Sequence, residues 1–193
     1  MQPLKFYSLP MFSFLLAAFS LPSDDFQESH FDKIASDNFH NFYRLNDSLY
    51  RSEQPNKKGM KELEAMGIKS ILNLRRQKTD KKKLKGLTLE LERIPLKASK
   101  LNFDDIFNAL QSIQQAEKPL LIHCWHGSDR TGAIVAASRM VFENWSKEQA
   151  IAEFTDEHFG YHQKRFPNLL TLLESLDVEL LKKKLAEDKI SQR

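Results

Sequence analysis

The chain has 193 residues, which is the size of one domain, or of one domain with a removable leader, and allows a substantial core. Hydrophobic residues make up 41% and charged residues 28%, and these ordinary proportions exclude a low-complexity or disordered chain. The net charge of +3 is small beside 29 basic and 26 acidic residues, so no nucleic-acid partner is expected.

The chain opens with an apolar stretch, residues 6–19, that follows Lys5 and contains no charge. Ala18 and Ser20 are small residues at the two positions that a signal peptidase inspects, and Pro10 interrupts a stretch that is short for a membrane span. We therefore expect residues 1–20 to be a secretory signal and the protein to be exported to the periplasm. The alternatives are a membrane anchor and a buried N-terminal segment.

Beyond the signal, strands alternate with helices and a helical region ends the chain. Alternating or unbroken apolar residues predict strands over 38–45, 48–51, 68–74, 87–95 and 119–123. Apolar residues at helical spacing predict helices over 57–66, 102–116, 133–142, 146–154 and, as one helix or two, 168–185. Asn56 and Ser146 are the expected caps of two of these helices.

This order of elements predicts an α/β fold with a central, mostly parallel sheet flanked by helices. We expect one folded domain over 38–185, preceded by an N-terminal extension over 21–37 and followed by a flexible tail over 186–193. The mature chain is not expected to insert stably into a membrane.

The segment 123–132 contains Cys124, the only cysteine of the chain. It stands between a predicted buried strand and a predicted helix, where the N–H groups of residues 125–130 can converge on an anion and the helix dipole adds positive potential. The same field stabilises the thiolate, which is the nucleophilic form of a cysteine. A lone cysteine forms no intrachain disulfide, and most lone cysteines are buried and inert, so the sequence context alone predicts a catalytic role for Cys124.

The residues after Cys124 suit a phosphate ligand. Arg130 offers a planar, permanently charged fork that matches two phosphate oxygens, and the Thr131 hydroxyl can donate a hydrogen bond to the Cys124 sulfur. Gly127 permits a tight turn, and Gly132 would let the next helix approach the sheet. The expected phosphate-binding loop consists of Trp125, His126, Gly127, Ser128, Asp129 and Arg130.

The order His-Cys, five residues, Arg, Thr-Gly over 123–132 resembles the signature of cysteine-dependent tyrosine and dual-specificity phosphatases. Asn-Phe-Tyr-Arg at 41–44 and Leu-Tyr-Arg-Ser-Glu-Gln-Pro-Asn at 49–56 are similar to the opening of compact dual-specificity-like phosphatases, including a bacterial periplasmic tyrosine phosphatase. The resemblance covers about residues 40–180. It implies a dual-specificity phosphatase-like fold, a phosphatase domain over 38–185, and two-step hydrolysis through phosphocysteine without a metal or cofactor.

The resemblance also implies a general acid, usually an aspartate on the loop after the preceding strand, and here the chain departs from it. The corresponding residues 95–100 read Pro-Leu-Lys-Ala-Ser-Lys and contain no carboxylate. Asp105 is the first candidate for the acid, and the alternatives are Asp104, Asp129 or no side-chain acid. Asp104 and Asp105 also suit the first turn of a helix, where the dipole favours carboxylates.

Two further groups of residues have both a functional and a structural interpretation. His123 and His126 flank the cysteine, but zinc sites draw ligands from several segments, so we expect no metal and expect His123 to order the loop. Residues 75–85 hold seven basic residues and one acid. Arg75 and Arg76 would form a rim that attracts highly anionic substrates, and the alternative is a solvated surface loop.

The resulting functional prediction is hydrolysis of a phosphorylated protein, foremost phosphotyrosine, or of a small phosphate ester. The basic rim keeps an inositol phosphate or phosphoinositide phosphatase as an alternative. The missing acid keeps an alternative of another class, a phosphate-binding module without turnover.

Overall fold

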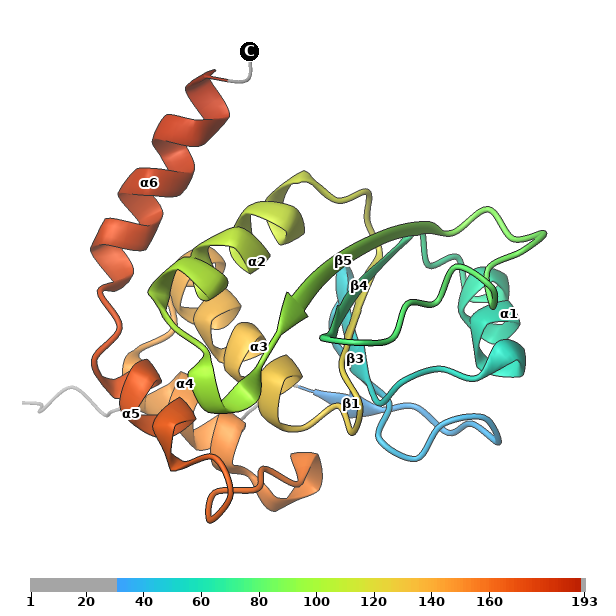
Figure 1. Ribbon diagram of the computed structural model, residues 1–193, viewed down its shortest axis with the longest axis horizontal. Coiled ribbons are helices and arrows are strands. Elements are labelled where there is room, and N and C mark those ends of the chain that lie inside the picture. Colours follow the sequence, from blue (N-terminus) through green and yellow to red (C-terminus); the bar gives the residue numbers. More distant parts are fainter. Residues whose placement is uncertain (1–30, 192–193) are drawn as a thin grey trace, which may run out of the picture.

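The computed structural model describes residues 31–191. In this part of the chain six strands form one sheet, in the order β1-β2-β3-β6-β4-β5, and helices lie on both of its faces (Figure 1). The predicted secretory signal over 1–20 lies outside the described residues, as does most of the extension predicted over 21–37. No helix within residues 31–191 is long and apolar enough to cross a lipid bilayer.

The elements follow the predicted alternation. The strands are β1 (Asp32–Lys33), β2 (Tyr43–Asn46), β3 (Leu49–Ser52), β4 (Ser70–Arg75), β5 (Glu90–Leu96) and β6 (Leu120–His123). The α-helices are α1 (Lys57–Ala65), α2 (Phe103–Gln115), α3 (Asp129–Phe142), α4 (Lys147–Thr155), α5 (Pro167–Glu174) and α6 (Val178–Ser191). The side chains of Asn56 and Ser146 cap α1 and α4 as expected.

Strand β6 lies inside the sheet, between β3 and β4, and is parallel to both. All four of its residues are buried, which explains its unbroken apolar sequence. Strand β4 is also parallel to β5, whereas β1, β2 and β3 pair antiparallel. The predicted α/β fold with a mostly parallel sheet is confirmed, and the carboxyl ends of β3, β4, β5 and β6 meet at one edge.

Side chains of β6 alternate between two hydrophobic clusters, one on each face of the sheet. Leu120 and Ile122 belong to the larger cluster, which includes residues of α2 to α6. Leu121 belongs to the smaller cluster, together with Met60 and Leu63 of α1. Because successive side chains of a strand point to opposite faces, this one short strand joins both cores and has a fixed position.

Three predicted boundaries differ from the structure. The strand predicted over 38–45 is reduced to β2, because Phe39 and Phe42 pack their rings 4.6 Å apart in the smaller cluster. Strand β1 pairs with β2, so part of the predicted extension belongs to the sheet. Helix α6 continues to Ser191, beyond residue 185, where the last predicted helix ends and the predicted tail begins.

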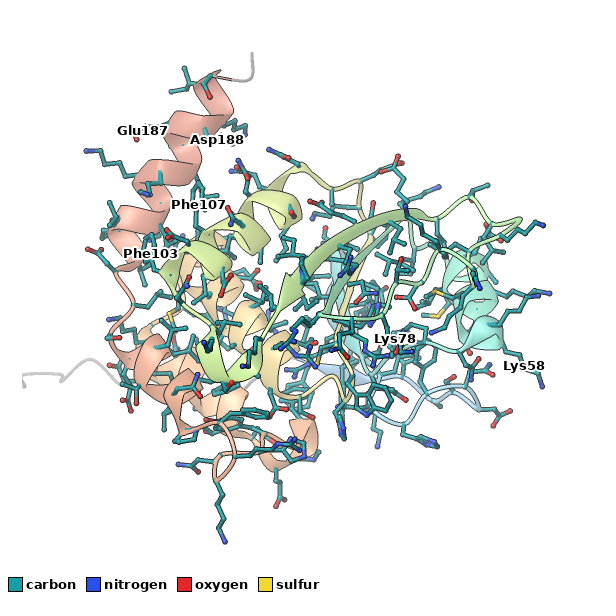
Figure 2. All side chains as sticks on the ribbon, viewed as in Figure 1. Lys58, Lys78, Phe103, Phe107, Glu187 and Asp188 are labelled. Atoms are coloured by element: carbon teal, nitrogen blue, oxygen red, sulfur yellow. The ribbon has the colours of Figure 1, made fainter. Side chains whose placement is uncertain are left out.

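The first turns of α6 lie beside α2, and the rest of α6 extends away from the fold (Figure 2). Leu181 and Leu185 are buried in the larger cluster. On the same stretch, Nζ of Lys184 lies 5.7 Å and 5.5 Å from the ring centres of Phe103 and Phe107 of α2. These contacts hold the first turns of α6 against α2.

Helix α3 is buried over most of its length and is joined to α4 by an ion pair. Nη2 of Arg139 lies 2.9 Å from Oε2 of Glu153 on α4, and the two side chains are only 2% and 1% exposed. Nη1 of Arg139 lies 2.7 Å from Oε2 of Glu143, whose side chain is 26% exposed. The buried pair therefore fixes α4 against the helix that follows Cys124.

We expect Glu153→Gln to lower the free energy of unfolding by about 3 kcal/mol, because Arg139 would lose its buried countercharge. Glu143→Gln removes the more exposed partner and is expected to cost less than about 1 kcal/mol. Urea unfolding of both variants and the wild type at neutral pH measures the difference. Equal losses in the two variants would contradict the dominance of the buried pair.

Candidate active site

The segment between β6 and α3, residues 124–128, forms a loop at the carboxyl edge of the sheet. Buried elements hold both of its ends, and Cys124, its first residue, is 1% exposed. The first turn of α3 follows directly and adds the positive end of its dipole. The loop thus has the strand-to-helix position that the sequence predicts for an anion site.

Every carbonyl of this loop accepts a hydrogen bond from the protein. A carbonyl oxygen can only accept, so the ring nitrogen of His123 that faces one of them carries the hydrogen. The donors and their carbonyls are His123 Nδ1 with Cys124 at 3.1 Å, Gln54 N–H with Trp125 at 3.1 Å, Asn41 Nδ2 with His126 at 2.8 Å, Arg51 Nη2 with Gly127 at 2.8 Å, and Gly132 N–H with Ser128 at 2.7 Å.

In a planar trans peptide the carbonyl and the following N–H point in opposite directions. Donors that bind the carbonyls therefore leave the N–H groups of the loop directed to the other side. Within the described part of the chain, no protein acceptor takes the N–H groups of residues 125–128. Successive N–H groups of this kind form a site for an anion.

Two glycines allow the close packing around the loop. Gly127 has a φ of 78°, and a Cβ there would lie 2.6 Å from backbone atoms of Ser52 and Glu53, beside the end of β3. A Cβ on Gly132 would lie 2.8 Å from the ring of Phe154 on α4. The same Cβ would lie 3.4 Å from Nη2 of Arg51 in β3, so Gly132 is close to the sheet, as expected, and closest to α4.

Arg130 is anchored to the ends of two strands. Its Nη1 donates to the carbonyl of Leu74 at 3.3 Å, in β4, and to the carbonyl of Leu96 at 3.4 Å, in β5. No other protein acceptor binds Arg130 in the described part of the chain. The remaining donors of the guanidinium are therefore available to a ligand.

An open hollow of about 470 Å³ lies beside the loop. Trp125 and Phe166 provide aromatic surface, and among the described residues no carboxylate lines the hollow. Its cationic lining residues are Arg75, Arg76, Lys97, Arg130 and Arg165. Five cations without an acid favour a ligand that carries more than one negative charge.

The basic stretch after β4 divides between this hollow and the solvent. Arg75 and Arg76 line the hollow, and the guanidinium of Arg75 lies 4.0 Å from the ring centre of Trp125. Burial and the nearby charge of Arg130 lower the pKa of Arg75 from its ordinary value. Three lysines within residues 81–85 are exposed, so that part is a solvated surface.

The side chains of the loop have different surroundings. Trp125 is 53% exposed, whereas Ser128 is buried. The rings of His126 and His162 lie 5.3 Å apart, and burial together with the neighbouring His162 lowers the pKa of His126. Within residues 31–191, no group of three His, Cys, Asp or Glu residues is placed to hold a metal ion.

Thr131 is fully buried in the first turn of α3, and its hydroxyl has no hydrogen-bond partner among the described residues. The predicted hydrogen bond from Thr131 to the Cys124 sulfur is therefore absent from this structure. The Thr131 hydroxyl and the Cys124 thiol are both buried at the loop, and the hydroxyl has a hydrogen-bond donor that no described residue accepts.

None of the three candidate acids lines the hollow. Asp105 closes a capping box, in which Oδ2 accepts from the N–H of Asn102 at 3.3 Å and Oδ1 of Asn102 accepts from the N–H of Asp105 at 3.0 Å. Asp104 is exposed in the same turn. Asp129 accepts from the N–H of His162 at 2.9 Å. In this structure Asp105 therefore caps a helix outside the hollow, and its role as the acid stays a prediction.

Asp80, the single acid of the basic stretch, is a buried residue that was not among the predicted site residues. Its Oδ2 lies 3.0 Å from Nε2 of His123 and accepts from Nδ2 of Asn73 at 2.5 Å. Its Oδ1 accepts from Nε2 of Gln54 at 2.8 Å and from Nζ of Lys83 at 2.9 Å. Burial alone would raise the pKa of Asp80, but His123, Lys83 and Gln54 outweigh it and hold the pKa well below its ordinary value.

These contacts join the segment after β4 to the nucleophile. Oδ2 of Asp80 lies 3.0 Å from one ring nitrogen of His123, and the other ring nitrogen donates to the carbonyl of Cys124. His123, which we predicted to order the loop, is therefore contacted by Asp80 on the side opposite to Cys124. A lone acid within a run of seven basic residues is the sequence signal that could have indicated Asp80.

Comparison with known proteins is consistent with this geometry. A family model described as the tyrosine phosphatase family matches residues 37–192. The dual specificity protein phosphatase TpbA of Pseudomonas aeruginosa is 30% identical over 122 residues, which are 62% of this chain and 56% of TpbA. The inositol diphosphatase DSP5 of Arabidopsis thaliana is 29% identical over 129 residues, 59% of this chain and 60% of the plant protein. The match thus spans somewhat more than half of each curated relative.

The crystal structure of P. aeruginosa TpbA superposes with a TM-score of 0.74 and 25% identity, over 83% of this chain and 98% of that one. TpbA has also been solved in complex with pTyr, with the same TM-score and coverage.

Asp80→Asn tests how far the buried carboxylate stabilises this part of the fold. A depressed pKa in the folded state means that the contribution of Asp80 is present above the unfolded value of about 4 and is lost as the pH falls below it. We expect the free energy of unfolding of the variant to be about 3 kcal/mol lower than that of the wild type at neutral pH, and the difference to shrink below about pH 4. Urea unfolding across this pH range measures it, and a pH-independent loss would be the contrary result.

Proposed function

The chain belongs to the tyrosine phosphatase family, and from this premise we propose that it hydrolyses phosphate monoesters through a phosphocysteine intermediate. The observation that carries the proposal is the loop of residues 124–128, in which every carbonyl is bound by the protein. The N–H groups that this leaves, together with Arg130, form a cradle for a phosphoryl group next to the Cys124 sulfur.

In the first step the Cys124 thiolate attacks phosphorus, so that an S–P bond forms and the P–O bond to the leaving group breaks. The loop N–H groups and Arg130 stabilise the charge on the equatorial oxygens. In the second step water attacks phosphorus, the S–P bond breaks, and inorganic phosphate and the thiolate are released. We propose that solvent supplies the proton to the leaving oxygen and accepts the proton from the attacking water.

Among the residues that the structure describes, no carboxylate lines the hollow, and this supports a preference among leaving groups. An alkyl ester leaves as a strongly basic oxygen and needs protonation, whereas an aryl phosphate or a phosphoanhydride leaves as a weaker base. The exposed ring of Trp125 adds surface against which a phenyl ring can pack. We therefore propose phosphotyrosine in proteins as the substrate, in line with the solved complex of TpbA with pTyr.

A second candidate substrate is an inositol phosphate, a phosphoinositide or an inositol diphosphate. The observation that favours it is the set of five cations around the hollow, which exceeds what one phosphate requires. One matched relative is described as an inositol diphosphatase, whose name refers to such a substrate. Phosphotyrosine peptide assayed beside inositol hexakisphosphate and a diphosphorylated inositol separates these candidates.

The candidate of another class is a phosphate-binding module without turnover. The lack of an identified general acid is the observation that keeps this candidate.

We also propose export of the protein to the periplasm, on the basis of the apolar, uncharged residues 6–19 and the small residues that follow. Phosphorylated groups of exported proteins would then be within reach of the enzyme.

Cys124→Ser is expected to abolish turnover while phosphate-ester binding remains measurable, because the loop N–H groups and Arg130 are unchanged. Steady-state hydrolysis of an aryl phosphate and calorimetry with phosphotyrosine measure the two effects. Turnover by the variant would contradict a mechanism through phosphocysteine. A wild-type protein that binds phosphotyrosine and never turns over would identify the binding module.

A series of aryl phosphates tests the leaving-group preference. We expect the rate to fall steeply as the pKa of the leaving phenol rises, because no side chain of the hollow donates a proton to it. Asp105→Asn, Asp104→Asn and Asp129→Asn should each keep the wild-type slope. If the hydrolysis rate of one variant falls roughly a hundredfold for weakly activated esters alone, that carboxylate is the acid. Proton donation from solvent to the leaving oxygen, as proposed here, would then be wrong.

A further inference from the structure

Arg51 is a buried cation beneath the phosphate loop. It lies in β3, pairs with Ile122 of the neighbouring β6, and is 1% exposed. Its Nη2 donates to the carbonyl of Gly127 at 2.8 Å, and its guanidinium lies 3.8 Å from the ring centre of Phe159. Arg51 therefore contacts the loop on the side that carries the carbonyls, away from the N–H groups.

The charge of Arg51 is poorly compensated by the groups that surround it. Its Nε and Nη1 have no hydrogen-bond partner among the described residues. Burial lowers the pKa of Arg51 to about 10, and the charges of Glu153 and Cys124 oppose that shift. An arginine with this pKa is still protonated at neutral pH, so the structure holds a buried charge with two unused donors.

The groups that face Arg51 come from four different elements. Tyr43 of β2, Arg139 of α3, Glu153 of α4 and Cys124 of the loop all act on its charge. Glu153 is already paired with Arg139, since Oε2 of Glu153 lies 2.9 Å from Nη2 of Arg139. Tyr43 is neutral at physiological pH, because burial raises its pKa above the ordinary value. Cys124, once ionised, is therefore the anion that remains to balance Arg51.

From this arrangement we propose that Arg51 is a positioning residue that stabilises the Cys124 thiolate from beneath the loop and turns the Gly127 carbonyl away from the phosphate. The planar peptide makes the second effect direct, because a Gly127 carbonyl bound below the loop directs the N–H of Ser128 above it. This inference extends the proposed function, but it concerns the thiol of the free protein and not turnover.

Arg51 and Arg130 then have separate tasks. Arg130 lines the hollow and binds the substrate, whereas Arg51 is not among the residues that line it. Arg75 also lines the hollow on the substrate side, and its charge interacts with that of Cys124. Loss of Arg51 should consequently change the ionisation of Cys124 without removing a ligand of the phosphate.

The test is the pH dependence of Cys124 alkylation by iodoacetamide in the full-length protein without substrate, which follows the thiolate population. Arg51→Met removes the charge at similar volume, and we expect it to slow alkylation at neutral pH roughly tenfold. Arg51→Lys keeps the charge and should retain most of the wild-type profile. If Arg51→Met does not fold, Arg51→Gln is neutral and can still donate to the Gly127 carbonyl.

Phe159→Leu is the matched control, because it removes the ring that packs on Arg51 and leaves the charge in place. It should lower the stability and keep the alkylation profile within about twofold of the wild type. A folded Arg51→Met or Arg51→Gln variant with the wild-type profile would overturn the proposal, as would an equal shift in Arg51→Lys or Phe159→Leu. Alkylation needs no turnover, so these outcomes stand apart from any failure of the proposed hydrolysis.

Discussion

The constraint on which the site depends is the orientation of the peptide groups between Cys124 and Ser128. A carbonyl turned toward the hollow would repel a phosphate oxygen, and each one is instead bound on the opposite side. The donors come from the segments around β2 and β3, from β6 and from α3. Only a fold that places β3 beside β6 and starts a helix directly after the loop brings these donors together.

The charges around the loop are arranged in two layers. Cations line the hollow on the substrate side, and no carboxylate of the described residues accompanies them there. Behind the loop, the negative charge of Asp80 is balanced by Lys83, and that of Glu153 by Arg139. A phosphate that enters the hollow therefore meets positive potential from the side chains, from the N–H groups and from the α3 dipole.

The parts of the structure that could be predicted are those that local sequence determines. The apolar run before Cys124, the caps Asn56 and Ser146, and the signature from Cys124 to Gly132 are each contained within a few residues. The contacts of Asp80 and Arg51 with the loop depend on which strands become neighbours. The lone acid within the basic stretch could have singled out Asp80, but no local pattern identifies the partners of either residue. The Asn102 and Asp105 capping box is local, and its spacing allowed either a cap or an acid.

The chain contains a single cysteine, and a thiolate stabilised at Cys124 for attack on phosphorus would also be sensitive to peroxide. A sulfenic acid formed there has no second thiol in the chain with which to form a disulfide. Its protection would have to come from an external thiol or from condensation with a backbone nitrogen. Without either, Cys124 would be oxidised further to the sulfinic acid, which cannot attack phosphorus. The loop could then still bind an anion but could no longer hydrolyse an ester.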